Sequence, residues 1–276
     1  MQMPNNLIEP ALPELARRFD AVDRLYRSGA QVDLSRSHVV VVGIGGVGSW
    51  VVEALARSGV GQLTMIDLDH ISESNINRQI HALGTTLGQA KVEAMANRIA
   101  DINPACQVIC HDAFVDPDNV QSVIDPSADL VIDCVDQVHA KIAMILTCKQ
   151  RQQALLVCGA AGGKTDALSL RHGDLRDASH DALLARARNV LRKQYGFPKS
   201  QPKRTPKMGV EIFWFAQPTL KPASWSDLSN SGHEPGAPLA CSGYGSAITV
   251  TATMGFVVAG KAVERLLQHY EVNVIE

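Results

Sequence analysis

Residues 39–48 read Val-Val-Val-Val-Gly-Ile-Gly-Gly-Val-Gly, an apolar strand-like run that passes directly into a glycine-rich turn. Residues 49–57 follow with helical composition. Glycines let the backbone turn tightly and approach a phosphate, whose charge then lies at the positive end of the next helix. We therefore predict that this loop binds a nucleotide through Gly43, Gly45, Gly46 and Gly48. The loop alone leaves open a dehydrogenase or a purely structural turn.

Short β-branched apolar runs alternate with helical segments on both sides of this loop. The expected strands are 38–42, 63–66, 108–110, 130–135 and 155–158. Strands that are apolar on both faces and separated by helices are typical of a parallel sheet covered on both sides. We predict an α/β fold with a doubly wound, Rossmann-like, mostly parallel sheet. The expected single domain, 1–276, comprises a helical arm (1–35), the core (36–163), an irregular loop-rich basic extension (164–245) and a closing C-terminal helix (246–276).

The overall composition is that of an ordinary globular protein. Apolar residues make up 46% and charged residues 20%, which excludes disordered and fibrous proteins. The formal net charge of -2 argues against a protein that coats nucleic acid through charge alone, but it allows a local basic site.

From the N-terminus and the cysteines we expect a cytoplasmic protein with reduced thiols. The N-terminus carries prolines and glutamates where a signal peptide needs a basic start and an apolar run. No pair of the six cysteines is spaced as Cys-x-x-Cys, so we expect no structural zinc. The uncharged stretch 235–260 is long enough to cross a bilayer, but its serines, threonines and glycines favour a buried helix and its approach loop.

Polar residues that follow the glycine loop narrow the choice of ligand. The second expected strand ends at Asp67, whose carboxylate can accept hydrogen bonds from ribose hydroxyls. Soon after Asp67 the chain carries Asn75, Arg78 and Lys91. A hydride-transfer enzyme does not require polar and cationic residues at these positions. An ATP site that cleaves at the α-phosphate does need fixed cations, here Arg78 and Lys91, and a carboxylate such as Asp136 to hold Mg²⁺.

Four motifs together resemble the ATP-site signature of a known superfamily. GIGGVG (43–48), DLDHISESNINRQ (67–79), GQAKVE (88–93) and DCVDQ (133–137) look like those of the ubiquitin-activating-like adenylating enzymes. That superfamily (HesA/MoeB/ThiF) includes the activators of molybdopterin and thiamin sulfur carriers. The resemblance implies that Gly46 lies against the phosphates of ATP, Asp67 on the ribose, Arg78 and Lys91 on the phosphates, and Asp136 on magnesium.

The same resemblance implies a homodimer in which an arginine of one subunit completes the site of the other. Arg18 occupies a matching N-terminal position, and the adjacent Arg17 is the alternative.

Within the superfamily, three further phrases resemble the tRNA threonylcarbamoyladenosine dehydratases. They are NRQIHAL (77–83), CSGYGS (241–246) and TVTATMGF (249–256). Sulfur-carrier activators commonly keep paired Cys-x-x-Cys zinc ligands, and their absence here favours the dehydratase branch. The resemblance implies ATP-dependent dehydration of threonylcarbamoyladenosine in tRNA to its cyclic form, through an acyl adenylate. It also implies association with a cysteine desulfurase and a sulfur-acceptor protein.

Two alternatives remain open at this point. One is an adenylyltransferase that activates the C-terminus of a ubiquitin-like sulfur-carrier protein. The other is a non-catalytic nucleotide-binding partner of a desulfurase.

Residues 186–207 form a basic stretch without a single Asp or Glu. The cations are Arg186, Arg188, Arg192, Lys193, Lys199, Lys203, Arg204 and Lys207. Helical spacing places Leu184, Ala187 and Leu191 on one face and the first four cations on the other. A solvated face is the ordinary explanation. With the RNA substrate that the resemblance implies, contact with tRNA phosphates is the favoured prediction.

Cys241 lies in a Gly- and Ser-rich turn before the last helix, where a helix N-terminus could favour its thiolate. Most lone cysteines are inert packing residues, as we expect of Cys134 and Cys158. The resemblance implies that a cysteine at position 241 receives sulfur or assists activation. Cys241 therefore joins Arg18, Arg78 and Lys91 as a candidate catalytic residue.

Overall fold

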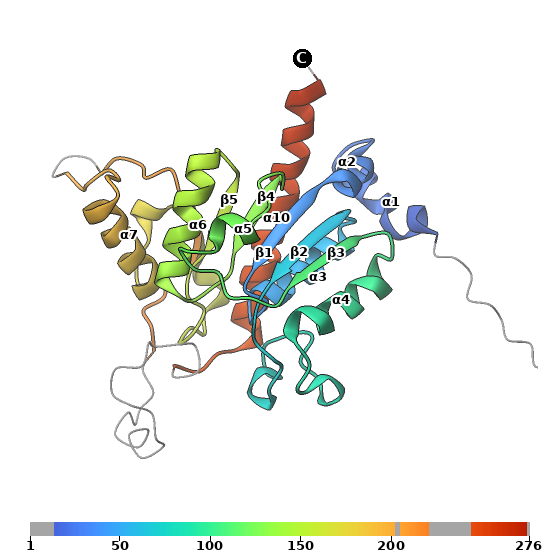
Figure 1. The fold of residues 1–276 in the computed structure, drawn as a ribbon, viewed down its shortest axis with the longest axis horizontal. Coiled ribbons are helices and arrows are strands. Elements are labelled where there is room, and N and C mark those ends of the chain that lie inside the picture. Colours follow the sequence, from blue (N-terminus) through green and yellow to red (C-terminus); the bar gives the residue numbers. More distant parts are fainter. Residues whose placement is uncertain (1–13, 202–204, 221–243, 275–276) are drawn as a thin grey trace, which may run out of the picture.

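The computed structural model describes residues 14–201, 205–220 and 244–274, which build a seven-stranded sheet (Figure 1). Its strands are β1 (His38–Val42), β2 (Gln62–Ile66), β3 (Gln107–His111), β4 (Leu130–Asp133), β5 (Leu155–Cys158), β6 (Leu170–Asp174) and β7 (Glu211–Phe215). The order is β3-β2-β1-β4-β5-β7-β6, and every neighbouring pair is parallel except β6 and β7. The predicted mostly parallel, doubly wound fold is confirmed.

Helices cover both faces of this sheet. They are α1 (Leu15–Leu25), α2 (Ala30–Arg36), α3 (Gly48–Arg57), α4 (Lys91–Ile102), α5 (Val120–Val123), α6 (Val138–Arg151), α7 (Ala182–Gln194) and α10 (Ile248–Val274). Apolar side chains of α3, α4 and α10 build one core against the sheet. Those of α5, α6 and α7 build the cores on the opposite face.

Two strands in the proline-rich extension were not expected from the sequence. β7 is buried from Ile212 to Phe215 and pairs with β5, so it continues the parallel sheet. β6 reads Leu-Arg-His-Gly-Asp and forms the sheet edge, where a strand needs no apolar face. A lone apolar run of four residues carries too little periodicity to distinguish a strand from a loop.

The closing helix α10 begins two residues after its predicted start at residue 246 and crosses the sheet beside α3 (Figure 1). A Cβ atom on Gly255 would lie 2.6 Å from Cβ of Trp50, so the two helices approach closely here. Val250, Met254 and Val258 are buried between them and the sheet. Across the described ranges, no helix combines the length and apolarity that a membrane crossing requires.

Candidate active site

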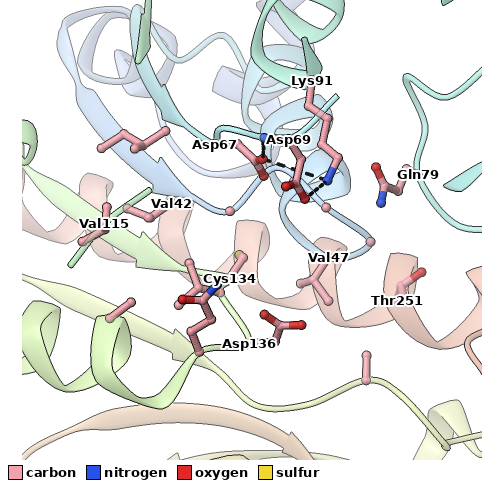
Figure 2. Close-up of a pocket in the computed structure, with 18 of the residues that line it drawn as sticks. Val42, Val47, Asp67, Asp69, Gln79, Lys91, Val115, Cys134, Asp136 and Thr251 are labelled. Atoms are coloured by element: carbon pink, nitrogen blue, oxygen red, sulfur yellow. Dashed lines mark hydrogen bonds and ion pairs between the residues drawn. The ribbon is translucent and has the colours of Figure 1, made fainter. Parts of the chain in front are cut away.

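A cavity of about 390 Å³ lies at the carboxyl ends of the parallel strands (Figure 2). It opens where the strand order reverses between β1 and β4, the position at which ligands bind in open α/β sheets. Its lining includes most of the residues predicted to bind ATP: Gly43, Gly45, Gly46, Asp67, Asn75, Arg78, Lys91 and Asp136. These residues, which are spread over the sequence from 43 to 136, therefore meet at one cavity.

The glycine loop connects β1 to α3 in a backbone conformation that side chains would obstruct. Gly43 has φ +85°, and a Cβ atom there would lie 3.0 Å from the Cys134 carbonyl group. A Cβ atom on Gly48 would lie 1.8 Å from the Gly43 carbonyl oxygen. Gly48 thus permits the tight turn without lining the cavity, and the loop directs the N-terminus of α3 toward the space for phosphates.

Asp67 follows β2 and is held by two backbone amides. Its Oδ2 atom accepts a hydrogen bond from Ile44 N at 2.6 Å, and Oδ1 accepts one from Asp69 N at 2.8 Å. Burial raises the pKa of Asp67, and the nearby Lys91 ammonium opposes that rise. The carboxylate is therefore fixed between the glycine loop and the segment after β2, at the wall of the cavity.

Lys91 is the first residue of α4, and its side chain is buried between two carboxylates (Figure 2). Its Nζ atom lies 2.6 Å from Oδ2 of Asp69 and 3.9 Å from Oδ1 of Asp67. The Asp69 side chain is 55% exposed, so it can turn away when an anion enters. Sequence reasoning singled out Lys91 but not the carboxylate that pairs with it.

Arg78 is oriented by its own loop and by α3. Its Nη1 atom donates to Ser74 O at 2.5 Å and to Asn77 Oδ1 at 3.0 Å. Trp50 Nε1 donates to the Arg78 carbonyl at 2.9 Å. Asn75 accepts a hydrogen bond from Ser72 N at 3.1 Å and so shapes the same loop. These contacts hold the guanidinium at the cavity wall before any ligand arrives.

Asp136 lies across the cavity from Asp67 and Lys91 (Figure 2). Within the described ranges, no group of three or more His, Cys, Asp or Glu side chains could hold a metal ion. Mg²⁺ commonly binds through one or two carboxylates together with substrate phosphates. Asp136 therefore fits a magnesium ion that arrives with ATP.

The loop that carries Asp136 starts from a buried ion pair that the sequence analysis missed. Lys141 is fully buried, and its Nζ atom lies 2.7 Å from Oδ2 of Asp133 and 3.0 Å from the Cys158 carbonyl oxygen. Burial raises the pKa of Asp133, and the Lys141 ammonium opposes the rise. Val135 N also donates to Asp133 at 3.0 Å, so the pair sets the path of the chain toward Asp136.

Several other lining residues were not predicted. Gln79 is buried beside the glycine loop, and its Oε1 atom has no hydrogen-bond partner in the described part of the chain. Ser246 lies just before α10, and Thr251 lies in its first turn. Ile66, Phe114 and Val115 supply apolar walls suited to a flat base. Only Gln79 had a sequence signal, because it directly follows Arg78 in the motif.

The two cysteines expected to be packing residues lie at the ends of neighbouring strands. Cys134 directly follows β4, and Cys158 is the last residue of β5. Cys134 Sγ is 3.7 Å from Cys158 Sγ, and this contact together with burial raises the pKa of Cys134. Cys158 is buried in the core, whereas Cys134 also lines the cavity. Cys241 lies outside the described residues.

Arg18 does not enter the cavity of its own chain. Its Nη1 atom donates to the carbonyls of Asp101 (2.6 Å) and Ile102 (2.7 Å), at the end of α4 opposite Lys91. The side chain of Arg17 is 82% exposed and lies 3.6 Å from Glu14. The prediction that one of these arginines acts across a subunit interface stays a prediction.

The basic stretch divides into cations turned inward and cations turned outward. Leu184, Ala187 and Leu191 are buried on one face of α7, as expected. Arg188 Nη1 donates to the Ala178 carbonyl at 2.8 Å, and Arg192 Nε donates to Pro198 O at 3.0 Å. The exposed members are Arg186, Lys193, Lys199 and Lys207, whereas Lys203 and Arg204 lie outside the described residues.

Comparison with known proteins gives a consistent result. A model of the ThiF family matches residues 19–276. The tRNA threonylcarbamoyladenosine dehydratase of Haemophilus influenzae is 41% identical over 253 residues, which cover 91% of this chain and 94% of the relative. Crystal structures of the Escherichia coli enzyme TcdA, in complex with ATP and with AMP, have TM-scores of 0.81 at 38% and 37% identity. Each match covers 93% of this chain and 96% of the other. The resemblance to the dehydratase branch is thus confirmed.

Proposed function

Because this chain belongs to the ThiF family, we propose that it is an ATP-dependent tRNA threonylcarbamoyladenosine dehydratase. One observation carries the proposal: relatives of that name match almost the whole chain. The predicted ATP residues that line one cavity agree with it. The sulfur-carrier adenylyltransferase is the less favoured reading, because the near full-length relatives bear the dehydratase name.

The proposed reaction is an adenylation followed by ring closure. The carboxylate of the threonylcarbamoyl group attacks the α-phosphate of ATP, and pyrophosphate leaves. An internal nucleophile of the modified nucleoside then attacks the acyl carbon, and AMP leaves with the former carboxylate oxygen. Water is thereby removed formally, and the nucleoside becomes cyclic.

The cavity residues perform binding, orientation and charge stabilisation in this scheme. Asp67 accepts from the ribose hydroxyls, and the glycine loop receives the phosphates at the N-terminus of α3. Arg78 and Lys91 stabilise the negative charge that develops on the α-phosphate and the departing pyrophosphate. When bound at Asp136, Mg²⁺ would supply further charge neutralisation on the phosphates.

The tRNA is proposed to contact the exposed cations of α7 and the segment after it. Four of these cations are exposed: Arg186, Lys193, Lys199 and Lys207. By contrast, Arg188 and Arg192 donate hydrogen bonds to backbone carbonyls of their own chain. The outward set is therefore the better candidate for contact with phosphates.

A homodimer is proposed as the working assembly. An apolar surface supports it: the side chains of Phe256, Val257 and Ile248 on α10 are 50%, 44% and 44% exposed. The Phe256 ring contacts the Trp50 ring, and Trp50 Nε1 donates a hydrogen bond to the Arg78 carbonyl oxygen. This surface therefore adjoins the proposed ATP site. Large exposed apolar groups commonly mark contact surfaces. A cytoplasmic location and an association with a cysteine desulfurase and sulfur acceptor are proposed from the resemblance alone.

The decisive assay uses purified protein, ATP and tRNA with or without the threonylcarbamoyl group. AMP formation and pyrophosphate exchange that require the modified tRNA are the expected result. Exchange that depends instead on a small protein ending in Gly-Gly would support the sulfur-carrier activator. Failure with both substrates would leave a non-catalytic nucleotide-binding protein.

A further inference from the structure

A second, smaller cavity opens beside the nucleotide cavity. Its volume is about 90 Å³, and Asp136 and Ala160 line both cavities. The other walls are Gly162, Asp181, Ala182, Leu183, Thr219 and Tyr244. A single water needs about 10–15 Å³ of such space. The smaller cavity therefore accommodates a group of several heavy atoms, but it is too small for a nucleotide.

Buried polar contacts hold the walls of this small cavity in place. The Lys164 side chain is buried, and its Nζ atom donates to the carbonyls of His180 and Gln217. These bonds join the residues before α7 to the segment after β7. Asp181 accepts from Ala160 N at 2.8 Å and from Leu184 N at 2.9 Å, which joins the turn after β5 to α7. The small cavity is thus preformed between three segments of the chain.

The chemistry of the walls suits a small group that bears both polar and apolar parts. Thr219 and Tyr244 carry hydroxyl groups. Ala182 and Leu183 are the first two residues of α7, and the backbone amides at a helix start have no acceptor within the helix. Their side chains add apolar surface. Asp136 and Asp181 also line the small cavity, but both oxygens of Asp181 already accept hydrogen bonds from backbone amides. The wall hydroxyls, the amides at the start of α7 and the apolar side chains together suit a short ligand that carries a carboxylate, a hydroxyl and a methyl group.

We propose that the small cavity binds the threonylcarbamoyl group of the substrate, with Ala182, Leu183 and Thr219 as its specificity residues. The inference rests on the proposed function. Because Asp136 lines both cavities, a carboxylate that enters from the small cavity meets the phosphate end of ATP. The adenine and ribose of the tRNA nucleoside remain outside, since the space admits only the acyl group.

The test fills the small cavity and measures discrimination between modified and unmodified RNA. Ala182→Trp adds bulk at an exposed position, so the core of the fold is not disturbed. Leu168→Trp is the matched control, because Leu168 is 90% exposed and lines neither cavity. Binding of an anticodon stem-loop, with and without the threonylcarbamoyl group, is measured in the presence of a non-hydrolysable ATP analogue. ATP affinity and AMP formation with modified tRNA are measured in parallel.

The wild type and Leu168→Trp should prefer the modified stem-loop by tenfold or more, on the order of the discrimination that one good contact set provides. Ala182→Trp should lose that preference and raise the KM for modified tRNA at least tenfold, with ATP affinity within twofold of wild type. If Ala182→Trp keeps the preference while the wild type forms AMP, the small cavity is not the subsite and the proposed function stands. If the wild type forms no AMP with modified tRNA, the proposed function fails and this inference fails with it.

Discussion

The Lys91 ammonium, proposed to bind phosphate, forms an ion pair with the Asp69 carboxylate at 2.6 Å. The cation is therefore oriented before ATP binds, and the exposed carboxylate is the group that has to move. Arg78 is likewise held in advance, by two hydrogen bonds within its loop. Preorganised cations of this kind stabilise a transition state without reorganisation during the reaction.

Replacing either cation should therefore affect chemistry more than folding. We expect Arg78→Ala and Lys91→Ala each to lower AMP formation by about a hundredfold or more, since each removes a donor aimed at developing charge. Single-turnover assays with modified tRNA measure the rate, and thermal unfolding measures stability. Lys261→Ala, on α10 and away from the cavity, is the control. Near-normal turnover in both cavity variants would exclude the adenylation model.

His81 provides a prediction about acid stability. It is 1% exposed, and neither ring nitrogen has a partner in the described part of the chain. Burial, with Lys91 and Arg98 nearby, lowers its pKa from 6.5 to about 4. The unfolded chain therefore binds the proton more tightly, so the contribution of His81 to stability is present above pH 6.5 and is lost as pH falls toward 4.

Between pH 7 and pH 5 this linkage removes about 2 kcal/mol from the free energy of unfolding. His81→Gln should lose correspondingly less over the same interval, as measured by urea unfolding at both pH values. The exposed His139→Gln is the control and should follow wild type. An identical loss in His81→Gln and wild type would show that His81 is not the group responsible.

At the scale of elements, the pair Asp133–Lys141 joins β4 to α6 out of contact with the solvent, because both side chains are fully buried. Removing one partner of such a pair leaves an uncompensated buried charge. Removing both partners leaves none, so the two kinds of variant should behave differently.

Lys141→Met should lower the free energy of unfolding by about 3–5 kcal/mol. Asp133→Val combined with Lys141→Met should regain most of that loss. Gln150→Met, at an exposed position of α6, is the matched control for the introduced side chain. Urea unfolding measures all three variants. If the double variant is less stable than Lys141→Met alone, Asp133 stabilises the fold by something other than compensating the charge of Lys141.

Helix α7 offers a test of the tRNA surface. The triple variant Arg186→Ala, Lys193→Ala and Lys199→Ala removes three exposed cations while leaving the anchors Arg188 and Arg192 in place. If each contacts a phosphate, the log-log slope of tRNA affinity against salt should flatten by about two, at roughly 0.7 per contact. ATP affinity should not change.

A second triple variant gives the control for net charge. Arg24→Ala, Arg36→Ala and Arg171→Ala also removes three exposed cations, from other parts of the surface. Its salt slope should remain that of wild type. Equal slopes in the two triple variants would identify α7 as an ordinary solvated face and direct the search for the tRNA surface elsewhere.

At the scale of the whole molecule, the position of Arg18 bears on assembly. Because its guanidinium caps α4 far from Lys91, it can serve an ATP site only in another subunit. In a mixture of Arg18→Ala and Asp136→Ala subunits, half of the dimers are hybrids and each hybrid has one complete site. Activity should therefore recover to about a quarter of wild type.

The same experiment with Arg17→Ala decides between the neighbouring arginines. Only the arginine that acts across the interface should give a variant that is inactive alone and recovers activity when mixed with Asp136→Ala, whereas a variant at the other arginine should be active alone. Light scattering reports the assembly state at the working concentration. A fully active monomer would contradict the shared-site arrangement.

The sequence predicted those parts of the molecule that depend on local pattern. The strand runs and the turn between β1 and α3 follow from side-chain periodicity and from glycine geometry, so residues 38–158 matched their expected elements closely. The pairing of Lys141 with Asp133 gave no signal, although Asp133 opens one of the quoted motifs, because a lysine on a helix is normally solvated and this one is buried only by the folded sheet. The small cavity was equally hidden, since its walls come from segments that the chain brings together only after folding.

The contribution of α10 to the nucleotide cavity also constrains when that cavity can exist. Ser246 and Thr251 line it, and α10 packs along α3 behind the glycine loop. These residues leave the ribosome after every strand of the sheet has been synthesised. A nascent chain that has released only the strands therefore presents an incomplete phosphate site with an uncovered apolar face. A nascent chain therefore cannot present the finished nucleotide cavity before its synthesis has passed residue 251.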